Sequence, residues 1–212
     1  MEFSIIIPAC QEEKYIESSL LSLPKEVDKI VVCNGCTDST ALIAGKYAKV
    51  LAIKERNVSK ARNLGAKSSQ GKILIFLDAD TRFHSQNLLE EIKKTLDDSS
   101  IGTCKVLPDN NKLKYKLAME VKNKLLWTRW TTGIIFCSKE VFNKSQGFNE
   151  KLTKKEDKDF TKRCLKHGKF GIANAHVISS MRRYEKVGIL KHAFYWIKET
   201  ISPSKEEYEI VR

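Results

Sequence analysis

Two aspartates, Asp78 and Asp80, follow directly on the apolar run from Ile73 to Leu77. Carboxylate oxygens are hard ligands suited to Mg²⁺ or Mn²⁺, ions that also bind phosphate oxygens. Two acids placed together beside a buried strand repel each other, and a cation would relieve that cost. The alternative is that one of them only caps a helix starting near Ser85. The pair thus indicates either a divalent cation site or a helix cap.

A second acidic pair, Glu156 and Asp157, stands at the expected start of a helix that runs to His167. A carboxylate in such a place can act as a general base for a hydroxyl nucleophile. The helix macrodipole also favours an acid at an N-terminus, which would keep its pKa low and make the pair an ordinary helix start. On spacing alone the ordinary helix start is favoured.

Three arginines are placed to meet an anionic ligand. Arg62 lies in a predicted helix from Val58 to Lys67, where its stem either packs on the sheet or faces solvent. Arg182 and Arg183 follow a predicted strand, and paired guanidinium groups suit bidentate contact with phosphate. A basic turn explains the last two residues equally well.

Six cysteines are scattered along the chain, and Cys33 and Cys36 form a Cys-x-x-Cys. This spacing suggests redox chemistry or half a zinc site, but no second Cys/His pair at ligand spacing accompanies it. Buried cysteines acting as small hydrophobic side chains are the better explanation. A chain of this size needs no disulfides, so the cysteines favour a reducing, cytoplasmic setting.

The residues that could do chemistry stand at the ends of predicted strands. Nearly continuous apolar runs separated by amphipathic helices are typical of a mostly parallel α/β sheet. Ligands bind beyond the carboxyl ends of such strands, so the segments 8–12, 33–38 and 78–80 should build one site. The predicted strands are Phe3–Ile7, Lys29–Cys33, Lys49–Ile53 and Lys72–Leu77, with helices at Glu12–Leu23, from about Thr37, and at Val58–Lys67.

The second half of the chain is less regular. A hydrophobic share of 42% with 30% charged residues is ordinary for a soluble globular protein and argues against disorder. No apolar run approaches the roughly 18–20 residues of a membrane span, and the acidic start that runs into a strand is not a secretory signal. The predicted elements are helices at Lys112–Trp127, Glu156–His167 and Val187–Thr200, and strands at Thr132–Cys137 and Ala175–Ser179.

Together these segments resemble glycosyltransferase family 2, the inverting enzymes with the GT-A nucleotide-sugar fold. The resemblance covers nearly the whole chain, and five segments occur in the family's order: SIIIPACQEEKYI, IVVCNGCTDST, NVSKARNLGAKSSQGKILIFLDADTRF, TGIIFCSKEVFNKSQGFNE and KEDKDFTKRCLKHG. It implies a Rossmann-like, mostly parallel central sheet flanked by helices, with a smaller acceptor-side lobe. Residues 1–212 would form one domain, with a nucleotide-sugar half at 1–100 and an acceptor half at 101–212.

The resemblance also implies roles for individual residues. Asp80 would be the ligand of a Mn²⁺ or Mg²⁺ ion on the donor diphosphate, and Asp157 would be the catalytic base. Glu156, Gly133 and Phe148 would contact the acceptor. The positions implied to contact the nucleotide part of the donor are Pro8, Ala9, Glu12, Asn34, Arg62, Asp78, Arg182 and Arg183.

The implied reaction moves a sugar from a UDP- or GDP-sugar to an acceptor hydroxyl or a lipid phosphate. The departing diphosphate develops negative charge, which a cation and basic side chains stabilise. Asp157 would take the hydroxyl proton while the oxygen attacks the anomeric carbon from the opposite face, and this single displacement inverts the configuration.

Two departures from the family pattern matter. The segment Cys33–Asp38 stands where the family commonly has DDGSTD, which leaves the choice of nucleobase open, and helix capping explains Asp38 equally well. The Gln-x-x-Arg-Trp motif of processive synthases is absent, which favours non-processive transfer by a small prokaryotic-type member.

Other functions fit fewer of the residues. A nucleotidyltransferase of similar fold would also use an Asp pair and a cation, but normally has a Gly-rich basic loop where this chain has the acidic PACQEEKYI. A basic nucleic-acid-binding module would bind in a salt-sensitive way, yet it leaves the acids of DAD and EDKD unexplained, so no nucleic acid partner is expected. The intact Asp78, Asp80 and Asp157 argue against an inactive scaffold.

The net charge of +12 comes from 38 Lys+Arg against 26 Asp+Glu, and all of the excess lies in residues 101–212. In the predicted helices 112–127 and 187–200 the lysines alternate with apolar residues. Apolar stripes of this kind usually face a core. The alternative is peripheral attachment to the anionic inner face of a membrane, which would deliver a saccharide or a lipid-linked, anionic acceptor.

Overall fold

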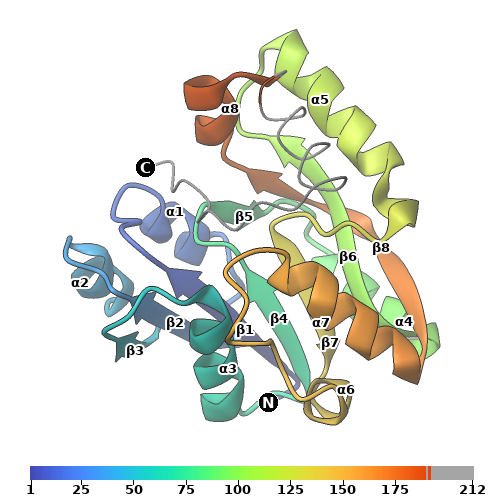
Figure 1. The fold of residues 1–212 in the computed structure, drawn as a ribbon. Coiled ribbons are helices and arrows are strands. Elements are labelled where there is room, and N and C mark those ends of the chain that lie inside the picture. The colour runs from blue at the N-terminus through green and yellow to red at the C-terminus, as the bar shows by residue number, and fades with distance from the viewer. Residues whose placement is uncertain (190, 192–212) are drawn as a thin grey trace.

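The computed structural model describes residues 1–189 and 191, and in this part of the chain eight strands form one sheet flanked by helices (Figure 1). The order across the sheet is β3-β2-β1-β4-β7-β6-β8-β5, so strands from both halves of the chain share it. The strands are β1 (Phe3–Ala9), β2 (Asp28–Asn34), β3 (Lys49–Ile53), β4 (Ile73–Leu77), β5 (Thr81–Phe83), β6 (Ser99–Pro108), β7 (Ile134–Ser138) and β8 (Lys169–Ser179).

The four strands predicted in the first half lie next to one another and run parallel, as expected from their apolar runs. Neighbouring apolar residues of β1 alternate between the two faces: Ile5 and Ile7 pack on one side of the sheet and Ile6 on the other. Because β1, β2 and β4 are covered on both faces, nearly every position after their starts can be apolar, whereas the edge strand β3 stays partly exposed. The carboxyl ends of β1, β2 and β4 therefore meet at one edge.

The sheet continues differently in the second half. β7 runs antiparallel to β4, β6 runs antiparallel to β7, and β8 lies parallel to β6. β6 was not predicted, because Ser99, Ser100, Gly102 and Thr103 interrupt its apolar pattern. Only the end of β8 was predicted, since its first residues alternate between exposed and buried as those of a strand covered on one face do.

Short helices connect the strands, and several begin later than predicted. Asp38 Oδ1 accepts a hydrogen bond from the backbone N–H of Thr40 at 3.1 Å, so the helix expected near Thr37 begins at Thr40. The helices are α1 (Ile16–Leu21), α2 (Thr40–Ala44), α3 (Val58–Ser68), α4 (Leu88–Asp98), α5 (Leu113–Lys124), α6 (Lys139–Lys144), α7 (Glu156–Cys164) and α8 (Arg182–Val187), with 3-10 turns at Leu126–Thr128 and Leu165–His167.

Four phenylalanines fix helices α6 and α7 of the second half of the chain to the sheet. Phe76 of β4 contacts Phe142 of α6, Phe148 of the following loop and Phe160 of α7, and the centroids of the last two rings are 4.1 Å apart. Aromatic pairs of this kind add to the free energy gained by burial. The cluster thereby holds the start of α7, which carries Glu156 and Asp157, near the end of β4.

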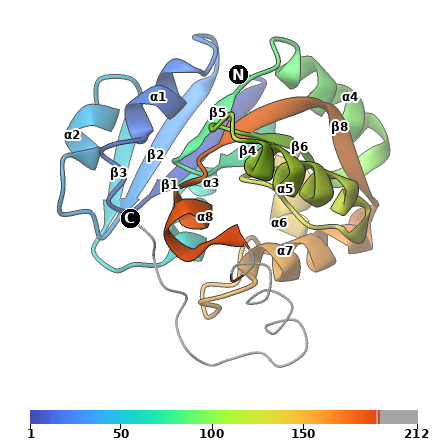
Figure 2. The same cartoon turned by 90° about the horizontal axis from the view of Figure 1, so that it is seen from above.

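Most of the helix predicted at Val187–Thr200 lies outside the described residues. α8 ends at Val187, and Gly188, Ile189 and Lys191 are the last described positions. In the described part of the chain, no helix is long and apolar enough to cross a membrane. Seen from above, α8 lies between the side of the sheet covered by α1 and α2 and the side that carries α5 and α7 (Figure 2).

Candidate active site

The ends of β1 and β2 are tied together by side chains of the segment after β2. The Asn34 side-chain amide donates a hydrogen bond to the carbonyl oxygen of Ala9 at 3.0 Å, and the Cys36 thiol donates to the same oxygen at 3.2 Å. Pro8, Ala9 and Asn34 are buried. Cys33 is packed in the core, as predicted for the cysteines, whereas Cys10 and Cys36 are only partly buried. The predicted contacts of Pro8, Ala9 and Asn34 with a nucleotide stay predictions.

Arg62 is the centre of the site. Its Nη1 donates to Asp157 Oδ1 at 2.6 Å and to Glu156 Oε1 at 3.2 Å, while its Nη2 lies 3.4 Å from Asp78 Oδ1. The guanidinium carbon lies 5.0 Å from the centre of the buried Phe148 ring, at cation–π distance. One side chain thus joins acids from the end of β4 and the start of α7.

The backbone around Arg62 explains its placement. The Asn57 side chain caps α3 by accepting a hydrogen bond from the Lys60 N–H at 2.8 Å. Gly65 lets α3 pack closely on β1, since a Cβ there would lie 2.3 Å from Ile6 Cγ2. Asn63 exchanges two hydrogen bonds with the backbone of Phe148, at 2.8 and 2.9 Å. α3 therefore positions both the arginine and the loop that leads to its acidic partners.

Asp157 has a strongly altered acidity. Burial raises the pKa of its carboxyl to about 7, with help from the nearby charges of Glu156 and Asp78, while the Arg62 guanidinium opposes the rise. Such a carboxylate exchanges its proton near neutral pH, which suits a general base. The sequence favoured an ordinary helix start for this pair, but the contacts with Arg62 show that both acids face the site.

Arg182 forms a second cluster. Its guanidinium makes a bidentate pair with Glu12, both contacts 2.7 Å, and its Nη2 lies 3.0 Å from Asp80 Oδ2. The guanidinium also lies 4.5 Å from the centre of the Tyr15 ring. Arg183 follows on α8 and its charge reaches Asp80. The Arg-Arg segment therefore lies against the acids at the strand ends, whereas its predicted contacts with the donor diphosphate stay a prediction.

Asp78 and Asp80 differ in environment. The Asp78 N–H donates to the carbonyl oxygen of Gly133 at 2.8 Å, and Gly133 has a positive φ of 37° and no room for a Cβ beside Thr81. Burial raises the pKa of Asp80 to about 6, with Arg182 opposing the rise. The carboxylate of Asp78 is about half exposed. Gly133 thus holds the backbone at the end of β4, whereas its predicted acceptor contact stays a prediction.

The acids at the end of β4 fit a divalent cation only in part. In the described residues, no group of three or more His, Cys, Asp and Glu side chains could hold a metal ion by itself. Asp80 is a hard oxygen ligand with a desolvated carboxylate, whose cost an ion would offset. The remaining ligands would have to come from diphosphate oxygens and water, which is the way Mg²⁺ is usually held at phosphate sites.

Lys122 was missed as a site residue. It lies on α5, and burial lowers the pKa of its ammonium group, whereas the charges of Asp78 and Asp80 raise it and that of Arg183 lowers it. The next residue, Asn123, fixes the helix by two hydrogen bonds to the backbone of Val106, at 2.8 and 2.9 Å. In the sequence, Lys122 is one of five lysines in the same stretch, and nothing distinguishes it from those that face solvent.

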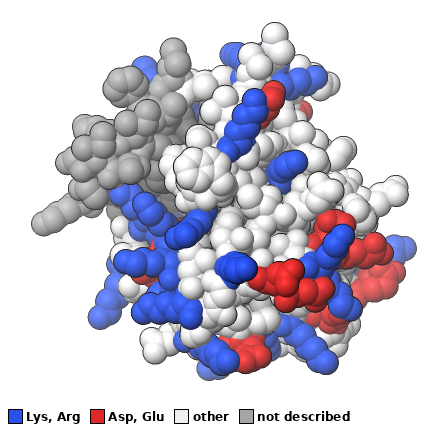
Figure 3. All heavy atoms as spheres, turned by 90° about the vertical axis from the view of Figure 1, so that its right-hand side faces the viewer, with Lys and Arg blue, Asp and Glu red and all other residues white. Residues whose placement is uncertain are grey.

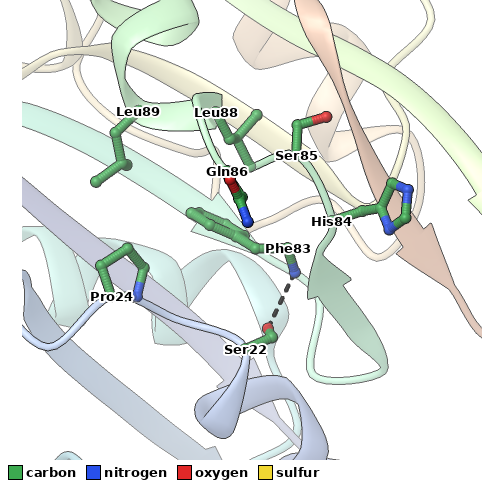
Figure 4. A pocket seen from close by; sticks show the side chains of 8 residues that line it. All are labelled: Ser22, Pro24, Phe83, His84, Ser85, Gln86, Leu88 and Leu89. Carbon is green, nitrogen blue, oxygen red and sulfur yellow. Dashed lines mark hydrogen bonds between the residues drawn. The ribbon is translucent and has the colours of Figure 1, made fainter.

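A separate cavity of about 150 Å³ lies between the end of α1 and the start of α4 (Figure 4). Ser22 and Pro24 line it on one side and residues 83–86, 88 and 89 on the other, and the Ser22 hydroxyl accepts a hydrogen bond from the Phe83 N–H at 3.0 Å. Its lining contains none of the acids or arginines described above. The candidate site is therefore the two arginine-centred clusters and not this cavity.

An α/β sheet with acids at the ends of its parallel strands and an acidic helix start beside them is the architecture of GT-A glycosyltransferases. The sequence model of the Glycosyl transferase family 2 matches residues 4–169. The chain belongs to this family of glycosyltransferases. The resemblance, the fold class and the enzyme class predicted from the sequence are thereby confirmed.

Two curated relatives show how far the sequence likeness extends. The chain is 34% identical over 101 residues to poly(ribitol-phosphate) beta-N-acetylglucosaminyltransferase TarS of Staphylococcus aureus, which is 42% of this chain and 18% of that protein. It is 38% identical over 100 residues to 4,4'-diaponeurosporenoate glycosyltransferase of Staphylococcus haemolyticus, 42% of this chain and 27% of that protein. The matched part is less than a third of either relative's length.

Solved structures match over more of the chain. Residues 1–349 of Staphylococcus aureus TarS in complex with UDP-GlcNAc superpose with a TM-score of 0.69 and 22% identity, covering 85% of this chain and 58% of that one. The mannosyltransferase PcManGT from Pyrobaculum calidifontis, in complex with GDP-Man and Mn²⁺, superposes with a TM-score of 0.65 and 17% identity. This match covers 93% of this chain and 64% of that one. At these identities the likeness shows the fold alone.

Proposed function

We propose that this chain is a metal-dependent, inverting glycosyltransferase that moves a sugar from a UDP- or GDP-sugar to an acceptor hydroxyl or a lipid phosphate in a single displacement. Similar folds bind UDP-GlcNAc in one solved structure and GDP-Man with Mn²⁺ in another, which supports both donor classes. Residues 1–100 and 101–212 are taken as the donor and acceptor halves of one domain.

The observation that carries the proposal is the Arg62 bridge. Arg62 Nη1 lies 2.6 Å from Asp157, the candidate base, and its Nη2 lies 3.4 Å from Asp78 at the end of β4. The candidate base and the strand end that would receive the donor diphosphate are thus separated by the width of one guanidinium group. A donor sugar bound beyond β4 would lie within reach of Asp157.

Each residue of the site then has a task. Asp157 takes the acceptor proton on Oδ2, because Arg62 occupies Oδ1 and fixes the orientation of the carboxylate. Arg182, Arg183 and Lys122 provide positive charge where the diphosphate leaves. Asp80 would hold the divalent cation, which supplies further charge stabilisation to the leaving group when bound. Inversion follows because base and leaving group stand on opposite sides of the anomeric carbon.

We place the reaction in the cytoplasm, with a saccharide or a lipid-linked, anionic acceptor at the inner face of the membrane. The six free thiols support a reducing compartment. The basic excess of residues 101–212 supports an anionic partner on the acceptor side.

The proposal is tested by Asp157→Asn with Asp159→Asn as the matched control. Both aspartates lie on α7 and their side chains are 34% and 33% exposed, but Asp159 pairs with Arg163 and not with Arg62. We expect Asp157→Asn to lose donor turnover, measured as release of UDP or GDP in the presence of Mn²⁺ or Mg²⁺, while thermal-shift titration gives little change in donor affinity. Asp159→Asn should keep turnover. Retained turnover in Asp157→Asn would remove this residue from the mechanism.

A further inference from the structure

The apolar stripe of α5 faces outward. Leu113, Leu117 and Val121 recur at a spacing of four, and their side chains are 69%, 53% and 59% exposed. The opposite side of the helix packs into the core through Tyr115 and Met119. The stripe that the sequence analysis assigned to a core is therefore on the surface, and a different pair of residues holds the helix to the sheet.

The exposed stripe continues into the turn after the helix. Leu125 is partly exposed, Trp127 is 75% exposed and Trp130 is also exposed. Ten large apolar side chains are exposed in the described part of the chain, and six of these lie between residues 113 and 130. We call these six the α5 patch: Leu113, Leu117, Val121, Leu125, Trp127 and Trp130.

The positive charge around the α5 patch indicates which kind of partner it fits. Residues 112–130 contain five lysines and one arginine against the single acid Glu120. On the face shown in Figure 3, basic side chains are spread widely, whereas the acidic ones gather mainly towards the lower right. A second copy of so basic a surface would be repelled, and a nucleic acid would not need exposed tryptophan, leucine and valine. Apolar and aromatic side chains among lysines are typical of helices that lie in the interface of an anionic bilayer.

We propose that the α5 patch docks on an anionic lipid bilayer, with its leucines, valine and tryptophans in the headgroup region and the flanking lysines on the lipid phosphates. Binding follows from two additive terms, apolar burial and attraction to anionic headgroups. Because Asn123 of α5 makes two hydrogen bonds to Val106 of β6, a docked α5 also holds the sheet that carries the site at the membrane surface. This last consequence rests on the proposed function, whereas docking itself does not.

Co-sedimentation of the full chain with vesicles tests the docking without any activity readout. We expect binding to vesicles of phosphatidylcholine mixed with phosphatidylglycerol, weak binding to phosphatidylcholine alone, and loss of binding at high salt. The double substitution Leu117→Glu and Trp127→Glu should reduce the partition coefficient at least about tenfold, since it removes apolar area and adds two negative charges. Leu42→Glu is the matched control, because Leu42 is 74% exposed but lies on α2.

Three results would overturn the proposal. Equal binding to neutral and anionic vesicles would remove the electrostatic part, and unchanged binding of the double variant would place the contact elsewhere. A melting temperature that falls in the double variant but not in Leu42→Glu would mean that protein and not lipid covers the patch. If vesicle binding holds but donor turnover is absent, the docking stands and the proposed function fails.

Discussion

Replacing Arg62 by Met tests the electrostatic design of the site most directly. The substitution keeps an apolar stem on Phe148 but leaves Asp78, Glu156 and Asp157 without their shared cation. Removing one partner of a fully buried ion pair costs about 3–5 kcal/mol. Because Asp78 and Asp157 are partly open to solvent, we expect the lower end, about 3 kcal/mol. For a chain of this length that corresponds to a drop of about 6–12 °C in melting temperature.

The loss should depend on pH in a defined direction. The folded-state pKa of Asp157, about 7, lies above its ordinary value of 3.8, so the folded chain binds more protons than the unfolded chain between these values. The free energy of unfolding therefore falls as the pH rises through this window. In the Arg62→Met variant the pKa of Asp157 rises further, because the opposing charge of Arg62 is gone. The free energy of unfolding of the variant therefore falls more steeply with pH than that of the wild type. We thus expect Arg62→Met to lower the free energy of unfolding only slightly at about pH 5 and by the full amount at about pH 8.

The assay is thermal unfolding of wild type and variant across that pH range, with Lys60→Met as the control. Lys60 lies on the same helix and pairs with Glu55, but both side chains are well exposed. Exposed pairs contribute at most about 1 kcal/mol, so this control should change little at any pH. Equal losses in the two variants, or a loss for Arg62→Met that is the same at every pH, would refute the electrostatic reasoning.

Two further predictions concern turnover and donor binding. Donor turnover should rise with pH with a midpoint near 7, because Asp157 must lose its proton to act as the base; a pH–rate profile measures this, and a profile that is flat through neutrality would contradict it. Lys122→Met should weaken donor binding about tenfold, the effect of losing one charge-assisted phosphate contact, while stability stays equal or rises because a desolvated ammonium group is removed. Isothermal titration with UDP- and GDP-sugars measures the affinity, and Lys114→Met, on the same helix, should leave it unchanged.

The sequence predicted the parts of the fold whose signals are local. β1, β2 and β4 are buried on both faces, so their apolar runs identify them, and the acids that follow β4 indicate a site at its end. β6 escaped because small and hydroxyl residues replace apolar ones where it packs against β7 and β8, including Gly102 beside Phe136. Its strand identity comes from neighbours distant in the sequence.

The sequence could not predict which face of α5 is buried, for a similar reason. The leucines and the lysines alternate, and a repeat of four residues fits either a core-facing or an outward-facing stripe. The rotation of α5 about its axis is set by Tyr115 and Met119, which pack against the sheet, and by the hydrogen bonds of Asn123 to β6. With these residues facing the sheet, the leucines face solvent and Lys122 faces the interior. Helical periodicity reveals a stripe but does not reveal which neighbour is present to cover it.

The net charges of residues 1–100 and 101–212 do not show the ion pairs that join these two halves. Arg182, from the basic half, pairs with Glu12 and Asp80 of the other half, and Arg62 pairs with Glu156 and Asp157 in the opposite direction. A donor diphosphate with its cation would bring the same charges to the same atoms: the cation to Asp80 and the phosphates to Arg182. Since arginine accommodates carboxylate and phosphate with the same bidentate geometry, the arginine would exchange one anionic partner for another instead of becoming newly charged or exposed. The arginines therefore offset part of the charge of the acids before the donor arrives, and they would become available to the phosphates when it binds.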